Sequence, residues 1–210
     1  MKPLWNFSLT IGLLLVAGNA PAFDLTPVMP LQYRNSTSKI VEVVCKYNEE
    51  KMWTIRLPDG ARFTPESPLS LLITPAVERS SIRITIAKLD GLPKDFESKE
   101  ALEYYDQFVK ANVPDSAKDI GQLKRAGTFA SKAGVLSDSF GLVYTFSLQK
   151  FAIGCGFINL PELGVQIRYT LNAPVESFEE LHRYIRYELS DLRTMTPAEV
   201  RKLNGTTLPE

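Results

Sequence analysis

Histidine and cysteine are scarce in this sequence, and neither sign of charge is in excess. There is one histidine, His182, and the two cysteines are Cys45 and Cys155. No C-x-x-C or H-x-x-x-H spacing occurs, and the sequence therefore predicts no metal site. The 24 basic and 24 acidic residues balance. This balance argues against nucleic acid as a partner, because nucleic-acid-binding domains carry an excess of basic side chains.

A membrane-spanning apolar run is also missing. The run Leu9–Ala17 is shorter than the roughly 20 residues that a spanning helix needs. Lys2 precedes this run, and Ala20-Pro21-Ala22 follow it with the small residues that a signal peptidase reads. The sequence predicts a signal peptide over residues 1–22, export to the bacterial periplasm or the extracellular space, and no stable membrane insertion after cleavage. An uncleaved N-terminal anchor is the alternative.

The glycine pattern of a dinucleotide-binding site is incomplete. Residues 151–160 read FAIGCGFINL, in which Gly154 and Gly156 form a G-x-G pair but Asn159 replaces the third glycine. No helical pattern follows this run, so it fails the fingerprint. The sequence predicts no cofactor.

Alternating apolar and polar residues are abundant, and they predict strands. The alternating runs are residues 41–47, 53–57, 82–87, 142–149, 151–160 and 165–172, with shorter candidates at 70–74 and near 122–130. Period-two patterns with one polar face are typical of antiparallel sheets. Pro58-Asp59-Gly60 predicts a turn between two of these runs. Arg83 and Arg168 lie on polar strand faces, where we expect solvated charges.

Two longer segments and one short one have helical signals. Residues 98–112 begin at a candidate N-cap, Ser98, and their apolar stripe is Leu102, Tyr105 and Val109. Residues 177–194 open with a Ser177–Glu180 capping box, and Thr196 with Glu199 predicts a second capping box and a last short helix. The predicted buried face of the long second helix is Phe178, Leu181, Ile185, Leu189 and Leu192.

The order strands, helix, strands, helix, helix predicts an α+β fold, with a single antiparallel sheet and helices packed on it. The small residues Ala152, Gly154 and Gly156 share one face of their strand. They would let a helix or a loop approach that face closely, or let the strand bend. A covered face would also fit an α-β-α sandwich. We expect an extended N-terminal arm over 23–38, the α+β domain over 39–194, and a C-terminal helix and tail over 195–210.

Several of these patterns resemble the PsbP-like superfamily, which includes the extrinsic photosystem II subunit and exported bacterial DcrB-type proteins. The likeness lies in LPDG at 57–60 after an early strand and SFEEL at 177–181 after the last strand. It covers about residues 50–194. The resemblance implies an α-β-α sandwich and a binding or assembly role without a shared catalytic set, so no functional residue is carried over.

Cys155 has several chemical interpretations. As a nucleophile it would need His182 as its base, the arrangement of a cysteine-dependent hydrolase. Its face neighbours Phe151, Ile153 and Phe157 are apolar, and such surroundings raise a thiol's pKa and leave little thiolate. A disulfide with Cys45 is the main alternative in an exported protein, provided that the two strands are neighbours. Two buried reduced thiols are the other alternative.

These observations favour an exported, non-enzymatic binding or assembly module. Its partner is a protein or a small ligand that the residues do not identify, and the exposed arm and tail are candidate contact segments. The alternative functions are a cysteine-dependent hydrolase that uses Cys155 and His182, and a carrier with a ligand pocket between sheet and helices.

Overall fold

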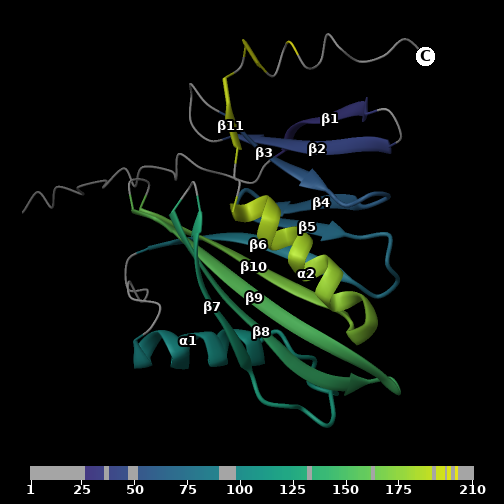
Figure 1. Ribbon diagram of the computed structural model, residues 1–210, viewed down its shortest axis with the longest axis vertical. Coiled ribbons are helices and arrows are strands. Elements are labelled where there is room, and N and C mark those ends of the chain that lie inside the picture. The colour runs from purple at the N-terminus through teal and green to yellow at the C-terminus, as the bar shows by residue number, and fades with distance from the viewer. Residues whose placement is uncertain are drawn as a thin grey trace, which may run out of the picture.

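The computed structural model describes two antiparallel sheets and two long helices (Figure 1). The described backbone covers 27–35, 38–46, 52–89, 98–131, 134–161, 164–190, 193–196, 198–199 and 202. The described side chains cover 53–89, 98–124, 142–161, 164–189, 195–196, 198–199 and 202. The predicted signal peptide, residues 1–22, lies outside these ranges.

The larger sheet contains seven described strands in the order β4-β5-β6-β10-β9-β8-β7. Every neighbouring pair in it is antiparallel, as the alternating patterns predicted. The strands are β4 (Arg62–Ser67), β5 (Ser70–Thr74), β6 (Ser81–Lys88), β7 (Lys124–Ser131), β8 (Gly134–Phe146), β9 (Gln149–Leu160) and β10 (Val165–Pro174).

A helix packs on each face of this sheet, so the α+β prediction is confirmed. α1 (Lys99–Lys110) and α2 (Val175–Ser190) belong to separate apolar clusters. The α1 cluster contains Ala101, Tyr105, Val109, Leu142, Tyr144, Phe151, Ile153, Cys155 and Phe157. The α2 cluster includes Ile82, Ile84, Ile86, Ile167, Tyr169, Leu171, Phe178, Leu181, Ile185 and Leu189. We call the two sides of the sheet the α1 face and the α2 face.

The smaller sheet departs from the prediction of a single sheet. Its described order is β1-β2-β3-β11, formed by β1 (Pro27–Asn35), β2 (Ser38–Lys46), β3 (Met52–Leu57) and β11 (Arg193–Met195). Much of the predicted arm is therefore strand β1, paired with β2. The tail is preceded by β11, which pairs with β3. Strands β1 and β11, far apart in the sequence, thus lie in one sheet.

The structure confirms the predicted turn and the second capping box, and it corrects two predictions about the helices. Gly60 has a φ of +72° and the Ala61 amide donates to the Pro58 carbonyl, which confirms the predicted turn. The Thr196–Glu199 capping box forms reciprocally. α2 begins at Val175, so the predicted Ser177 cap lies inside the helix. Leu102 is 42% exposed, so it is not part of the buried stripe of α1.

Ser98 caps α1, because its Oγ accepts a hydrogen bond from the Ala101 amide at 3.1 Å. Replacing Ser98 with alanine leaves that amide without its acceptor and is expected to lower the free energy of unfolding by about 1 kcal/mol. Urea unfolding measures this change. Ser98→Asp keeps an acceptor and should lose little, and an equal loss in both variants would contradict the capping role.

The β8–β9 hairpin turns through Ser147 and Leu148, whose φ angles are +47° and +65°. Leu148 is fully exposed, and its left-handed backbone is strained for a residue with a Cβ. Leu148→Gly is expected to raise the free energy of unfolding by about 1 kcal/mol. Thermal unfolding tests this, with Leu148→Ala as the control that keeps the strain. An equal gain in the alanine variant would assign the effect to the apolar side chain.

Candidate functional site

Cys155 lies on β9 within the α1 cluster. It is 0% exposed and belongs to the apolar cluster with Phe151, Ile153 and Phe157, the same three neighbours that the alternation predicted. In the sheet it pairs with Thr170 of β10 and Ser139 of β8. A thiol enclosed in this way is poorly placed for nucleophilic attack, because burial disfavours the thiolate and blocks access.

His182 lies on the opposite side of the sheet. It is 4% exposed on α2, its Nε2 is 3.0 Å from the Tyr169 hydroxyl, and its ring stacks on Phe178. Burial lowers the pKa of His182 to about 4, and the charge of Arg186 adds to the shift. The imidazole is therefore neutral at physiological pH and holds a polar contact within the α2 cluster.

The structure does not bring the predicted dyad together. Cys155 contacts the α1 cluster, whereas His182 contacts Tyr169 of the α2 cluster. A cysteine–histidine dyad needs its sulfur and imidazole nitrogen within hydrogen-bond reach. The sheet stands between these two groups, so the geometric premise of the hydrolase alternative is wrong.

The neighbouring-strand premise of the predicted disulfide is also not met. Cys45 is a residue of β2, which pairs with β1 and β3 in the smaller sheet, and Cys155 is in β9 of the larger sheet. The side chain of Cys45 lies outside the described residues. The bridge remains a prediction, which titration of the denatured, unreduced protein with a thiol reagent tests. If no thiol reacts, the result supports the bridge. If two thiols react, the result excludes it.

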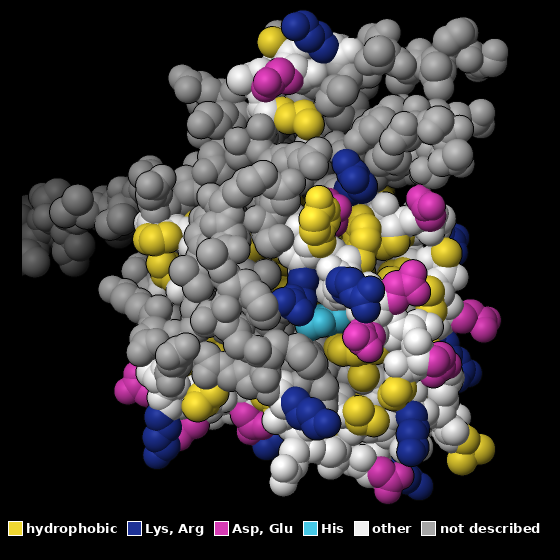
Figure 2. Space-filling model, viewed as in Figure 1, with side chains coloured by type: hydrophobic (Ala, Val, Ile, Leu, Met, Phe, Trp, Pro, Cys, Tyr) yellow, Lys and Arg dark blue, Asp and Glu magenta, His cyan; other side chains and the backbone are white. Residues whose placement is uncertain are grey.

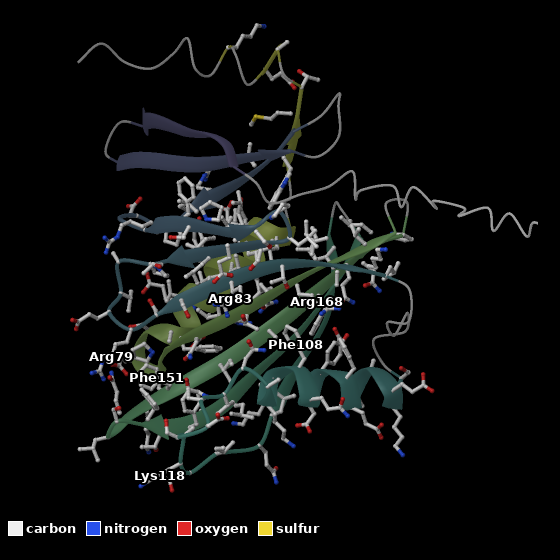
Figure 3. All side chains as sticks on the ribbon, turned by 180° about the vertical axis from the view of Figure 1, so that it is seen from behind. Arg79, Arg83, Phe108, Lys118, Phe151 and Arg168 are labelled. Atoms are coloured by element: carbon white, nitrogen blue, oxygen red, sulfur yellow. The ribbon has the colours of Figure 1, made fainter. Side chains whose placement is uncertain are left out.

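Part of the α1 face is left uncovered by α1. The helix packs against β9, while the side chains that β5 and β6 direct to this face, and Arg168 of β10, are half-buried or exposed. Figure 3 shows Arg168 and Phe108 close together at one edge of α1, with Arg83 farther across the sheet. We define the open patch as Ser70, Leu72, Ser81, Arg83, Thr85 and Arg168.

The open patch is organised by hydrogen bonds around two arginines. Arg83 donates from Nε and Nη2 to the two carboxylate oxygens of Glu66, both at 2.9 Å. This pairing lowers the pKa of Glu66 and raises that of Arg83. Arg168 donates from Nε to Gln166 Oε1 at 2.9 Å, and Gln166 in turn donates to Asn159 Oδ1 at 2.8 Å.

Aromatic rings of α1 hold the Arg168 guanidinium from the other side. Its central carbon is 5.6 Å from the ring centre of Tyr104 and 5.7 Å from that of Phe108, within the range of a cation–π interaction. Burial lowers the pKa of Arg168 and raises that of Tyr104. Arg168 was predicted to be a solvated charge; it is instead half-buried and fixed on three sides.

No sequence signal identified this arrangement. Arg168 is on the polar side of an alternating strand, and Tyr104 and Phe108 lie outside the predicted apolar stripe of their helix. They meet because α1 crosses back over β9, and helix placement over a sheet depends on contacts far apart in the chain. Spacing along one strand cannot report such contacts.

Other surface features of the described residues point to no further chemistry. Figure 2 shows Lys and Arg interspersed with Asp and Glu on the α2 side, in keeping with the balanced composition. Within the part of the chain that the structure describes, no cluster of three metal-ligating side chains occurs. Nor does any described helix have the length and apolarity to cross a membrane.

Comparisons with known proteins find solved structures of limited similarity to this chain. No family model matches this sequence, and no curated protein matches it. A solved variant of the protein Mog1 is similar over 66% of this chain and 91% of its own, with 10% identity and a TM-score of 0.43. LpqN, involved in cell envelope biogenesis of Mycobacterium tuberculosis, is similar over 75% of this chain and 92% of its own, with 16% identity and a TM-score of 0.44. These values carry no argument about activity or partner.

Proposed function

We propose that this chain is an exported, non-enzymatic binding or assembly protein that contacts its partner through the open patch. The observation that carries the proposal is the uncovered part of the α1 face, where hydrogen bonds hold Arg83 and Arg168, and where both of them and Thr85 remain accessible. A polar surface ordered in this way can recognise a partner through complementary charges and hydrogen bonds.

Site-specific photocrosslinking tests the surface. A benzophenone amino acid at Thr85, in the open patch, is expected to give a light-dependent adduct with one partner in the envelope or extracellular fraction of the host. The same probe at Glu179, exposed on α2, is the control and should give none. Equal adducts from both positions, or none from Thr85, would refute the proposed surface.

Export is tested separately, because a partner could be contacted in any compartment. Fractionation of the host should find the chain outside the cytoplasm. Mass spectrometry of that fraction is expected to show a mature chain that begins at Phe23, after Ala20-Pro21-Ala22. A cytoplasmic chain that retains Met1 would contradict the prediction of export and leave the surface proposal to its own test.

A further inference from the structure

Within the part of the chain that the structure describes, the terminal nitrogens of Arg168 have no hydrogen-bond partner. Among the described residues its guanidinium makes one hydrogen bond, from Nε to Gln166, and two ring contacts, with Tyr104 and Phe108. Arg83 on the next strand is already neutralised by Glu66. Arg168 therefore presents two nitrogens and one uncompensated, half-buried positive charge to the open patch, and burying such a charge is unfavourable unless a counter-charge approaches it.

Tyr104 supplies a second unsatisfied group beside this charge. Its hydroxyl oxygen is buried and has no hydrogen-bond partner among the described residues, and burial raises the pKa of Tyr104, so the hydroxyl stays protonated and can donate. Buried polar atoms in folded proteins are nearly always hydrogen-bonded to protein, water or ligand. The Tyr104 hydroxyl and the Arg168 guanidinium therefore offer unsatisfied hydrogen-bond donors side by side, as an anion-binding site requires.

We infer that Arg168, held by Tyr104, Phe108 and Gln166, binds a carboxylate group of the ligand that the open patch recognises. A guanidinium fork matches the two oxygens of a carboxylate and pairs with them through two parallel hydrogen bonds. One positive charge is balanced by one carboxylate, whereas a phosphate dianion would leave excess negative charge in a half-buried place. Thr85, directly opposite Arg168 in the sheet, lies where the rest of the ligand would extend.

Titration of the purified protein with sodium acetate tests this inference by nuclear magnetic resonance. The Arg168 Nε–Hε signal is expected to shift saturably, with a dissociation constant that is roughly millimolar, and sodium chloride at the same ionic strength should not reproduce the shift. Arg168→Lys should weaken acetate binding about tenfold or more, because an ammonium group cannot form the fork. Arg183→Gln, at an exposed ion pair on α2, is the matched control and should bind like the parent.

Several results would overturn the carboxylate site. They are an unsaturable shift, equal binding by the parent and Arg168→Lys, or inorganic phosphate binding more tightly than acetate. Tyr104→Phe keeps the ring under the guanidinium and removes the hydroxyl, so it should weaken acetate binding about threefold without unfolding the protein. Unchanged binding in that variant would remove Tyr104 from the site.

Titrations with two peptides distinguish the possible sources of the carboxylate. A blocked tetraglutamate peptide that binds at least tenfold more tightly than acetate, and a tetraglutamine peptide that does not bind, would assign an acidic segment of a protein as the ligand. Equal affinity per carboxylate would assign a small organic acid. The inference rests on the proposed function: loss of acetate binding with a persistent Thr85 crosslink overturns the carboxylate site alone, whereas acetate binding without a crosslink overturns the proposed partner surface.

Discussion

Replacing Phe157 with alanine is expected to lower the free energy of unfolding by about 4 kcal/mol, the usual range for a buried phenylalanine. Phe157 is 0% exposed on the interior strand β9. Its ring centre lies 5.5, 4.6 and 5.2 Å from those of Tyr104, Tyr105 and Phe108. These three contacts attach α1 to the sheet, so the cavity would remove both buried area and ring–ring attraction.

Two measurements test the Phe157→Ala variant, one of the whole fold and one of α1 alone. Urea unfolding gives the change in stability, and amide hydrogen exchange shows whether α1 opens more readily than the rest of the fold. Phe157→Leu keeps most of the volume and is expected to lose about 1.5 kcal/mol or less. A loss below 2 kcal/mol for the alanine variant, with unchanged exchange in α1, would contradict the anchoring role.

The arrangement of side chains along single strands was predictable because it is a local property. Successive strand residues point to opposite faces, so the partition of β9 into Phe151, Ile153, Cys155 and Phe157 against Ala152 followed from order alone. The structure confirms that partition, since the first four are in the α1 cluster and Ala152 is in the α2 cluster. The small-residue side was expected to admit a helix or a loop or to bend, and in the structure α2 packs against β9.

The face on which each helix would pack was not predictable from these patterns. His182 lies on the apolar stripe of α2, and Cys155 lies on an apolar strand face. These two observations are equally compatible with contact between His182 and Cys155 and with their separation by the sheet. The outcome depends on how α2 folds back after β10 and how α1 crosses between β6 and β7. Both are non-local choices, and sequence periodicity describes only single elements.

Strands β4 and β11, each at the edge of its sheet, were missed for a different physical reason. β4 (Arg62–Ser67) has one half-buried residue, Phe63, and the others are exposed, so it carries no alternating apolar pattern. β11 (Arg193–Met195) has three residues and is too short for any period to appear. Both are specified by backbone pairing with a neighbour, β5 for β4 and β3 for β11.

His182 is expected to make the protein less stable in mild acid. The folded pKa is lowered to about 4, first by burial and then by Arg186, whereas an unfolded histidine has a pKa of about 6.5. Because the unfolded state binds the proton more tightly, stability falls as the pH drops from about 6.5 towards 4 and changes little from this group below 4. The difference corresponds to a loss of about 3 kcal/mol.

Urea unfolding at a series of pH values measures this loss in the parent and in His182→Gln. Glutamine keeps a polar group near the Tyr169 hydroxyl and does not titrate, so the variant should lose the part of the slope between pH 6.5 and 4 that His182 contributes. Arg186→Gln removes a nearby positive charge and should raise the folded pKa, which makes the loss smaller. A parent slope that persists in His182→Gln would assign it to the carboxylates instead. Since the neutral imidazole packs between Phe178 and Tyr169, protonation would weaken the packing of α2 on β10, the strand whose other face carries Arg168.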